Sequence, residues 1–311
     1  MQEKVTPHLK KQFAVSEIYR QYALPKNVAT VYDHPEVDPL HEEIYSPVKG
    51  LVHKFPNRVL IKVSFRCAAH CQFCTRSREI GSAEGDLTVP DVIAILNYIK
   101  QRPQINDVIL LGGDPFYTPK ISFQLIDELS KVSSIKVLRV GTRLPCHNPR
   151  SFFTKPVQDL LQKLEHVAAA NPLFVLINFT HPSELSDETR SVLGDFRRRG
   201  FLLLSQTVFL RGINDNFEIL RELFEQLYFL GVQPYYLYRC DQVKGLESYV
   251  FDLDKEIMIA SKLRTELSGI ACPTYIVDVT GRGKIPVPLN YWDGTDLTAC
   301  RDFDGRQTSI N

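Results

Sequence analysis

The sequence lacks an excess of charge of either sign, because 37 lysine and arginine residues balance 36 aspartate and glutamate residues in a chain of 311. Proteins that bind nucleic acid usually present a basic field, so this balance argues against that class and favours small-molecule chemistry. The sequence also contains no apolar run near the length of a membrane span, and its first residues lack the apolar centre of a signal peptide. We therefore expect a cytoplasmic protein with neither a nucleic acid nor a membrane as its partner.

Paired cysteines and linkers rich in serine, glycine or proline are missing as well. Of the seven cysteines, three stand close together, and Cys146, Cys240, Cys272 and Cys300 are scattered without a pairing rhythm. This scatter argues against disulfides and favours a reducing compartment. With 44% hydrophobic residues the chain can bury a sizeable core. The absence of a linker favours one large α/β unit over two small domains.

From Val59 onwards, short β-branched or leucine-rich runs alternate with amphipathic helices, which is the pattern of βα units around a parallel sheet. Six such repeats and a last strand are too few to close an eight-fold barrel. We therefore expect an α/β fold, an open and partial (βα)6-type TIM-like barrel, with its site at the carboxyl ends of the strands. The predicted strands are 59–65, 107–111, 136–141, 173–179, 201–208, 233–239 and 273–279.

The chain divides by pattern into three regions. Residues 1–50 are polar with little periodicity, and they predict an N-terminal helical extension that packs outside the core. Residues 51–290 carry the barrel, and 291–311 form a short tail. The sequence indicates no function for the extension.

Three cysteines, Cys67, Cys71 and Cys74, follow the first predicted strand in the spacing C-x3-C-x2-C. A loop that folds back after a strand can place three thiolates on an iron–sulfur cubane and leave the fourth iron open to a small molecule. One alternative is a zinc site with His70 or His53 as the fourth ligand, although no second C-x-x-C or H-x3-H pair is present. Another is three reduced cysteines in a core.

Unusual residues also follow the other predicted strands. Gly112, Gly113 and Asp114 end the second strand, where paired glycines allow a ligand to approach the backbone and the carboxylate can accept from an amine. Further polar stretches stand at 75–78, 205–216, 234–241 and 277–288. The carboxyl ends of the strands are therefore the predicted site.

In this order the motifs closely resemble those of lysine 2,3-aminomutase and its bacterial relatives, which are radical S-adenosylmethionine (SAM) enzymes. The resemblance runs from near Tyr45 almost to the C-terminus. It implies that Cys67, Cys71 and Cys74 hold a [4Fe–4S] cluster whose open iron binds SAM. It further implies SAM contacts from the residues at the family's SAM-binding positions: Gly112, Gly113, Asp114, Gln206, Asn178, and Phe73 against the adenine.

The same resemblance implies a second cofactor, pyridoxal 5'-phosphate (PLP). Lys284 matches the catalytic lysine that forms a Schiff base with PLP, and a desolvated lysine at the end of a glycine-rich turn suits this task. The alternative is a solvated loop lysine. Lys54, Phe55 and Arg58 match the segment that contacts the PLP phosphate. The family more often has arginine and tyrosine where this chain has Lys54 and Phe55. Lys54 keeps the positive charge but lacks the two-donor fork of arginine, and Phe55 lacks the hydroxyl of tyrosine.

The resemblance also implies how a substrate would bind. Arg76 matches the residue that pairs with the substrate carboxylate, a task that suits a planar fork. Asp241 and Asp278 match two carboxylates that receive the distal ammonium of lysine. Two acids in a buried pocket repel each other unless a cation lies between them, so the pair favours a cationic amino acid. The alternative is a pair of unrelated caps at strand ends.

Two departures from the family pattern stand out. Asn178 replaces a histidine that contacts SAM in relatives, so that hydrogen bond must change or be lost. The glycine-rich turn before Lys284 is one residue shorter than in the best-known members and carries Arg282.

We therefore predict an isomerase, a radical SAM and PLP-dependent aminomutase that moves the α-amino group of L-lysine to the β-carbon. A one-electron reductant such as flavodoxin or ferredoxin would be its partner, and a homo-oligomer stays open. The sequence does not separate free β-lysine synthesis from β-lysine made for elongation factor P. The alternatives are the same reaction on arginine or ornithine, and a non-catalytic metal-binding protein.

Overall fold

The computed structural model describes residues 2–13, 17–23, 38, 40–82, 84–241, 246–279, 283–289, 299–301 and 307–309. Within these residues a nine-stranded sheet runs in the sequential order β1 to β9. Strands β2 to β8 pair in parallel, and β1 and β9 add an antiparallel strand at each edge. The strands are β1 (Leu51–Phe55), β2 (Arg58–Ser64), β3 (Asp107–Gly112), β4 (Val137–Thr142), β5 (Leu173–Asn178), β6 (Leu202–Val208), β7 (Gln233–Tyr238), β8 (Thr274–Val279) and β9 (Gly283–Pro286).

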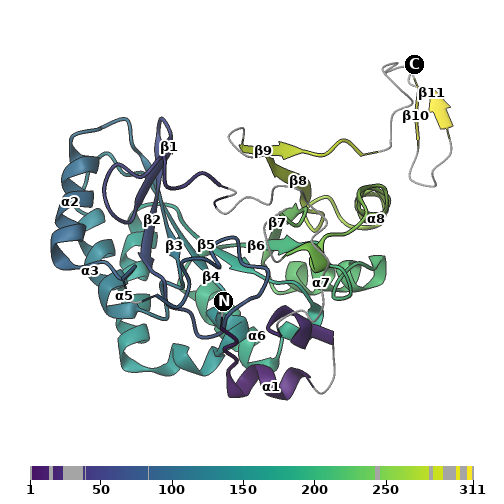
Figure 1. The fold of residues 1–311 in the computed structure, drawn as a ribbon, viewed down its shortest axis with the longest axis horizontal. Coiled ribbons are helices and arrows are strands. Elements are labelled where there is room, and N and C mark those ends of the chain that lie inside the picture. Colours follow the sequence, from purple (N-terminus) through teal and green to yellow (C-terminus); the bar gives the residue numbers. More distant parts are fainter. Residues whose placement is uncertain are drawn as a thin grey trace.

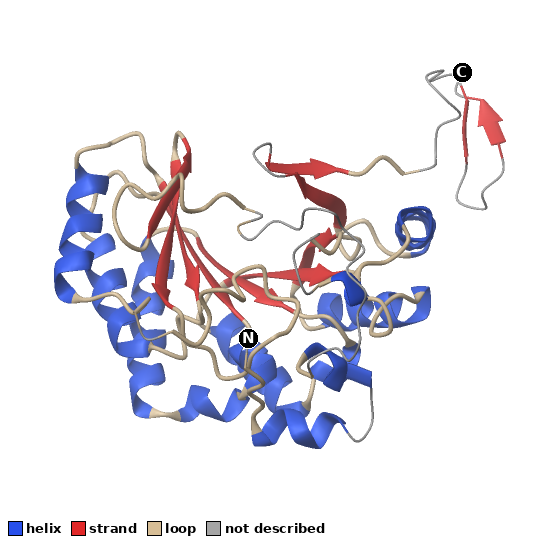
Figure 2. Ribbon diagram, in the orientation of Figure 1, coloured by secondary structure: helices blue, strands red, loops and turns tan. Residues whose placement is uncertain are grey.

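The helices lie on the convex side of the curved sheet and leave the concave side open (Figures 1 and 2). One helix follows nearly every parallel strand, which is the arrangement of a partial TIM-like barrel. The fold class predicted from the sequence is therefore confirmed, and every predicted strand is present to within one residue at either end. The helices in this layer are α2 (Val89–Lys100), α3 (Pro119–Leu129), α4 (Leu144–His147), α5 (Lys155–Ala170), α6 (Asp187–Arg198), α7 (Phe217–Phe229) and α8 (Leu253–Glu266).

Local sequence signals set the helix ends. Thr88 and Asp91 form a capping box at the start of α2, and the side chains of Ser186, Asn216 and Asp252 accept hydrogen bonds at the starts of α6, α7 and α8. Gly231 follows α7 with φ of 71°, the left-handed conformation that ends many helices.

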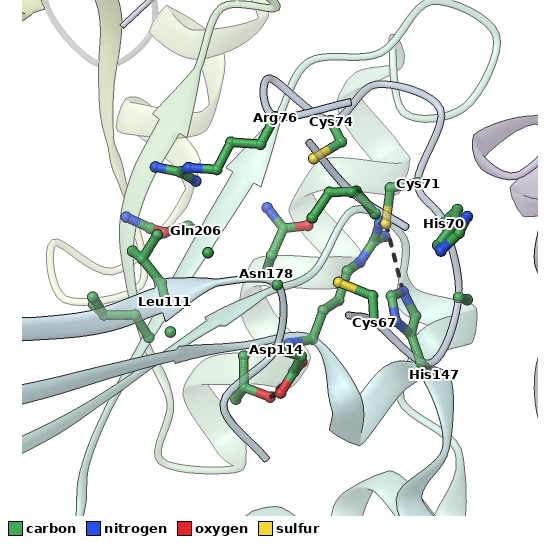
Figure 3. A pocket seen from close by; sticks show the side chains of 18 residues that line it. Cys67, His70, Cys71, Cys74, Arg76, Leu111, Asp114, His147, Asn178 and Gln206 are labelled. Carbon is green, nitrogen blue, oxygen red and sulfur yellow. Dashed lines mark hydrogen bonds between the residues drawn. The ribbon is translucent and has the colours of Figure 1, made fainter. Parts of the chain in front are cut away.

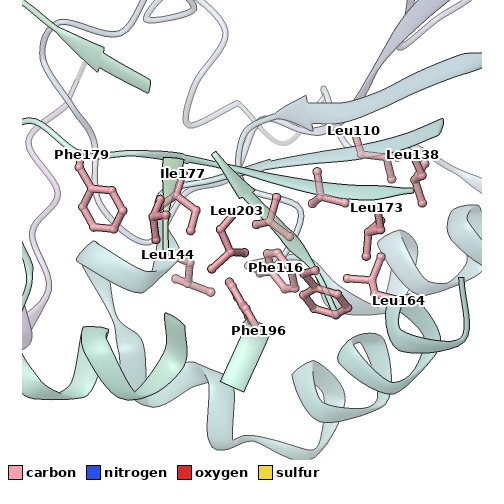
Figure 4. Close-up of a cluster of buried hydrophobic side chains, with 14 of the residues drawn as sticks. Leu110, Phe116, Leu138, Leu144, Leu164, Leu173, Ile177, Phe179, Phe196 and Leu203 are labelled. Atoms are coloured by element: carbon pink, nitrogen blue, oxygen red, sulfur yellow. The ribbon is translucent and has the colours of Figure 1, made fainter. Parts of the chain in front are cut away.

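The core lies between the sheet and the helices. In β3, Val108 and Leu110 are fully buried beneath the helices, whereas the alternate residues Ile109 and Leu111 line a cavity on the concave side. Figure 4 shows the helix side of this core, where Phe116 and Phe196 stack with ring centroids 5.8 Å apart. One face of the sheet therefore supplies stability, and the other is available for a ligand.

The edge strands β1 and β9 were not predicted. The sequence of β1 is short and partly polar, and β9 ends at Pro286 with Pro288 close behind; prolines are typical of edge strands because they cannot donate to a ladder. A separate two-stranded sheet joins β10 (Ala299–Arg301) to β11 (Gln307–Ser309).

The described part of the N-terminal extension holds α1 (Pro7–Phe13) and the 3-10 helix η1 (Glu17–Gln21), as predicted. Three further 3-10 turns, η2 (Pro149–Phe153), η3 (Pro182–Glu184) and η4 (Glu247–Tyr249), connect barrel elements. The division into extension, barrel and tail stays a prediction. None of the helices in the described ranges has both the length and the apolar character needed to cross a bilayer.

Candidate active site

Two adjoining cavities open at the carboxyl ends of the parallel strands. The smaller has a volume of about 180 Å³ and the larger about 670 Å³. They share part of their lining, including Cys71, Cys74, Arg76, Asn178 and Gln206. Every residue predicted from the sequence as a site residue lines at least one of the two: Lys54, Phe55, Arg58, Cys67, Cys71, Phe73, Cys74, Arg76, Gly112, Gly113, Asp114, Asn178, Gln206, Asp241, Asp278 and Lys284.

The segment that carries Cys67, Cys71 and Cys74, called the cysteine loop below, follows β2 and is fixed against the end of β3. Gly113 N donates to Ser64 O at 2.5 Å, and Asp114 N donates to Arg66 O at 2.9 Å. A Cβ atom on Gly113 would lie 2.3 Å from Arg66 O, so only glycine allows this approach. The paired glycines therefore allow another segment of the protein's own backbone to approach. The sulfurs of the three cysteines face the smaller cavity (Figure 3).

The three thiols suit an iron–sulfur cluster. Burial raises the pKa of each, to about 11 for Cys74, so near neutral pH a bound metal is needed to keep them as thiolates. Within the described residues no three His, Cys, Asp or Glu side chains are grouped as the ligands of a single metal ion would be. Thiolates of a cubane each bind a different iron and need no such grouping.

Neither histidine of the zinc alternative is placed as a ligand. His70 lines the smaller cavity, with its Nδ1 2.8 Å from the carbonyl oxygen of Gln2, but among the described residues it is not grouped with the cysteines as the ligand of a single metal ion would be. His53 Nδ1 lies 2.9 Å from the hydroxyl of Tyr98, and His53 lines neither cavity. The donor set therefore fits the cluster better than a zinc ion.

The N-terminal extension holds the outer side of the cysteine loop. Lys4 Nζ donates to Cys67 O at 2.6 Å, and His70 N donates to Lys4 O at 3.0 Å. Farther along, Gln72 N donates to Gln21 O at 2.7 Å. The described residues 2–13 and 17–23 thus hold the backbone of the cysteine loop in place.

Arg143, at the end of β4, is a site residue that sequence reasoning missed. Its side chain is buried, with Nη1 2.8 Å from Cys71 Sγ and Nη2 2.7 Å from Glu184 Oε1. It lines both cavities. A buried guanidinium beside a thiolate neutralises its charge. Its position directly after a strand was the available signal, because polar residues follow other strands of this sheet as well.

Asp114 has a structural use that the sequence did not reveal. Its carboxylate accepts hydrogen bonds from Thr142 Oγ1 and from the backbone N–H groups of Phe116, Arg143 and Leu144, at 2.8 to 3.0 Å. These donors fix the turn from β4 into α4. The acid therefore contributes to the cavity by holding this turn beside the two glycines.

The amide side chains of Asn178 and Gln206 differ in whether they already have a hydrogen-bond partner within the protein. Asn178 Oδ1 is buried and has no hydrogen-bond partner among the described residues, so it is free to accept from a ligand that fills the cavities. Gln206 Nε2 donates to the hydroxyl of Tyr238 at 2.9 Å. Phe73 lines the larger cavity. The Arg143 guanidinium lies over its ring, with Cζ 5.0 Å from the ring centroid.

The larger cavity brings the two edges of the sheet together. Lys54, Phe55 and Arg58 come from the β1–β2 hairpin, and Lys284 comes from β9. A Cβ atom on Gly283 would lie 3.8 Å from the Phe55 ring, so the two edges are close to contact. The lysine and the three residues expected near a phosphate therefore line one chamber, while residues 280–282 of the glycine-rich turn, with Arg282, lie outside the described residues.

Charges of both signs face this chamber. Lys284 Nζ lies 2.6 Å from Asp278 Oδ2. Burial, and then repulsion from Asp278, raise the pKa of Asp241 to about 6. Arg76 Nε donates to Glu42 Oε2 at 3.0 Å. The predicted acid pair is thus next to a cation, and the predicted carboxylate-binding arginine already has a carboxylate partner that the sequence did not reveal.

Comparisons with known proteins agree with this site. The model of the Radical SAM superfamily matches residues 61–224. A putative L-lysine 2,3-aminomutase from Aquifex aeolicus is 34% identical over 278 residues, which are 88% of this chain and 73% of the relative. The L-lysine 2,3-aminomutase of Clostridium subterminale is 34% identical over 88% of this chain and 65% of its own length.

Among solved structures, a radical SAM methyltransferase from Sphaerobacter thermophilus superposes with a TM-score of 0.52 at 17% identity, over 75% of this chain and 69% of that one. At this identity the likeness concerns the fold alone. The family model covers the strands that surround the cysteine loop, and the aminomutases match most of the chain. The protein therefore belongs to the radical SAM superfamily and, within it, to the lysine 2,3-aminomutase family.

Proposed function

We propose that this protein converts L-lysine to β-lysine as a radical SAM, PLP-dependent aminomutase. The observation that carries the proposal is that three thiols and Lys284 line two joined cavities. The family implies a [4Fe–4S] cluster, SAM and PLP. When bound, the reduced cluster and SAM supply a carbon radical that abstracts hydrogen, and PLP holds the migrating nitrogen and delocalises an unpaired electron.

The residues of this chain would bind, orient and exclude water. Cys67, Cys71 and Cys74 would hold the cluster in the smaller cavity, and Lys284 would hold PLP in the larger one. Arg58 and Lys54 would face the PLP phosphate, with Phe55 beside it. SAM would contact Gly112, Gly113, Asn178, Gln206 and Phe73 where the cavities join, and Asp114 would support the turn behind it.

A cationic amino acid suits the charges of the larger cavity. Asp241 and Asp278 would receive the distal ammonium and Arg76 the carboxylate, so that both ends of the substrate are held while its middle reacts. In the structure the place of a cation against Asp278 is taken by Lys284, at 2.6 Å. The acids report charge more than chain length, so arginine and ornithine are the comparison substrates.

We also propose the cytoplasm as the compartment and a low-potential one-electron donor, such as flavodoxin or ferredoxin, as the partner. The six cysteines whose side chains are described are all free thiols, which suits a reducing environment. Homo-oligomer formation is a separate proposal that gel filtration of the holoenzyme tests.

The deciding experiment is a product assay. The protein is purified without oxygen, loaded with iron, sulfide and PLP, reduced, and incubated with SAM and L-lysine, L-arginine or L-ornithine in parallel. We expect β-lysine as the main product. β-Arginine or β-ornithine in its place would change the substrate, and a colourless zinc protein without turnover would overturn the proposal.

A further inference from the structure

Arg76 makes a two-point contact with Glu42, which no motif of the sequence singled out. Its Nε donates to Glu42 Oε2 at 3.0 Å, and its Nη2 donates to Glu42 Oε1. Glu42 is 4% exposed and lines the larger cavity with Arg76. A buried carboxylate of the protein is therefore part of the place where the substrate carboxylate is proposed to bind.

Glu42 is held firmly in this position. Its carboxylate lies 3.8 Å from the ammonium of Lys62, and Lys62 is in turn paired with Glu79 at 2.8 Å. Arg78 extends this cluster of alternating charges, because it lies 3.7 Å from Glu79 and 3.1 Å from Asp38. Ser46 Oγ donates to Glu42 O at 2.7 Å, so the backbone of the turn is anchored as well.

The contact uses only one side of the guanidinium. Arginine has five N–H donors in a planar fork. Glu42 accepts from Nε and Nη2, which form one edge of the guanidinium. Nη1 has no hydrogen-bond partner among the described residues. The outer pair, Nη1 and the second hydrogen of Nη2, can still bind a second carboxylate at two points. Arg76 also lines both cavities.

We propose that Glu42 is a positioning residue that fixes the Arg76 guanidinium so that its outer two nitrogens receive the α-carboxylate of the amino acid substrate. This inference rests on the proposed function and deepens it, because it states how the carboxylate end of the substrate is recognised. A bidentate pair adds geometric specificity that a freely rotating guanidinium would lack.

The opposite role for Glu42 makes an opposite prediction. If its carboxylate merely competed with the substrate for Arg76, removing its charge would leave the guanidinium free and more attractive to an anion, and KM would fall. If Glu42 positions Arg76, the same change frees the guanidinium to rotate, and KM rises. The sign of the change in KM separates the two.

The test compares Glu42→Gln with the wild type in holoenzymes of equal iron and PLP content. Glu43→Gln is the matched control, because Glu43 is adjacent in the chain but its side chain is 70% exposed and pairs with Arg78. We expect Glu42→Gln to raise KM for L-lysine by about tenfold or more with a smaller effect on kcat, and Glu43→Gln to leave both unchanged.

Two further readouts exclude a merely structural effect. L-lysine amide lacks the negative charge, so the preference of the enzyme for lysine over the amide should shrink in Glu42→Gln. In an Arg76→Lys background, which lacks the fork, Glu42→Gln should have little additional effect on KM, because the role acts through Arg76. A misfolded variant would lose activity toward both compounds equally.

A KM that falls or stays unchanged in Glu42→Gln overturns the role of Glu42. A wild type that makes no β-lysine but isomerises arginine or ornithine corrects the substrate only, and the same comparison of KM then applies to that amino acid, which carries the same carboxylate. A wild type inactive toward all three overturns both proposals.

Discussion

Replacing Asp241 with asparagine should stabilise the cofactor-free protein while weakening its recognition of lysine. Burial and the neighbouring Asp278 raise the pKa of this carboxyl from 3.8 to about 6. For an acid, a folded pKa above the unfolded one means that ionisation disfavours the folded state. The penalty is absent well below pH 4, grows between pH 4 and pH 6, and is fully present above pH 6.

The size of the effect follows from the shift. Each pKa unit corresponds to 1.36 kcal/mol, so about two units make the ionised carboxylate cost about 3 kcal/mol at pH 8 and about half of that at pH 5. Asparagine has no proton to lose. Asp241→Asn should therefore raise the free energy of unfolding by about 3 kcal/mol at pH 8, which is a rise of about 4 °C in Tm for a chain of this length.

Thermal unfolding of the cofactor-free wild type and variant, at pH 5 and pH 8, measures this. Asp278→Asn is the matched control: it also removes one acid from the cavity, but it removes the ion-pair partner of Lys284, so we expect no such gain. In the holoenzyme, Asp241→Asn should raise KM for lysine, and the wild-type KM should rise as pH falls through 6. A variant no more stable than the wild type at pH 8 would refute this reasoning.

Three further predictions concern the cofactor sites. Lys284→Ala should abolish the visible absorbance of bound PLP and turnover while leaving the iron content unchanged; turnover at the wild-type rate would contradict its assignment. Cys71→Ser should lose iron and brown colour, whereas Cys272→Ser, which changes a thiol that lines neither cavity, should retain both; equal iron in the two would argue against a cluster on the loop. Deleting residues 2–23 should speed alkylation of the thiols of Cys67, Cys71 and Cys74 in the cofactor-free protein because the hydrogen bonds that hold the cysteine loop are lost, with Cys272 as the internal reference thiol; unchanged rates, read by mass spectrometry, would show that these residues do not protect the loop.

The sequence predicted the sheet well because most of the parallel strands are runs of β-branched or leucine residues between helical patterns, whereas β7 is rich in tyrosine. Polar residues at the ends of the predicted strands were expected to lie together. In the structure the three cysteines, Gln206 and Asp241 line the two joined cavities. The edge strands escaped notice because β1 is short and β9 adjoins prolines. The roles of the site residues in catalysis stay proposals.

Two charged residues have partners that sequence patterns could not reveal. Glu42 lies 34 positions before Arg76, and Arg143 lies 72 positions after Cys71. Each is a single charged residue whose partner is brought near by the fold alone. Local patterns report helix faces and strand ends, but a pair of this kind depends on how the turn before β1 and the end of β4 fold over the open side of the sheet.

The larger cavity has walls from both edges of an open sheet, and this has a consequence for biosynthesis. The thiols of the cysteine loop are made at least 210 residues before Lys284. Iron and sulfide delivered early would meet a loop with no completed chamber behind it. Maturation factors that load the cluster should therefore favour chains that already include Lys284 over shorter nascent chains.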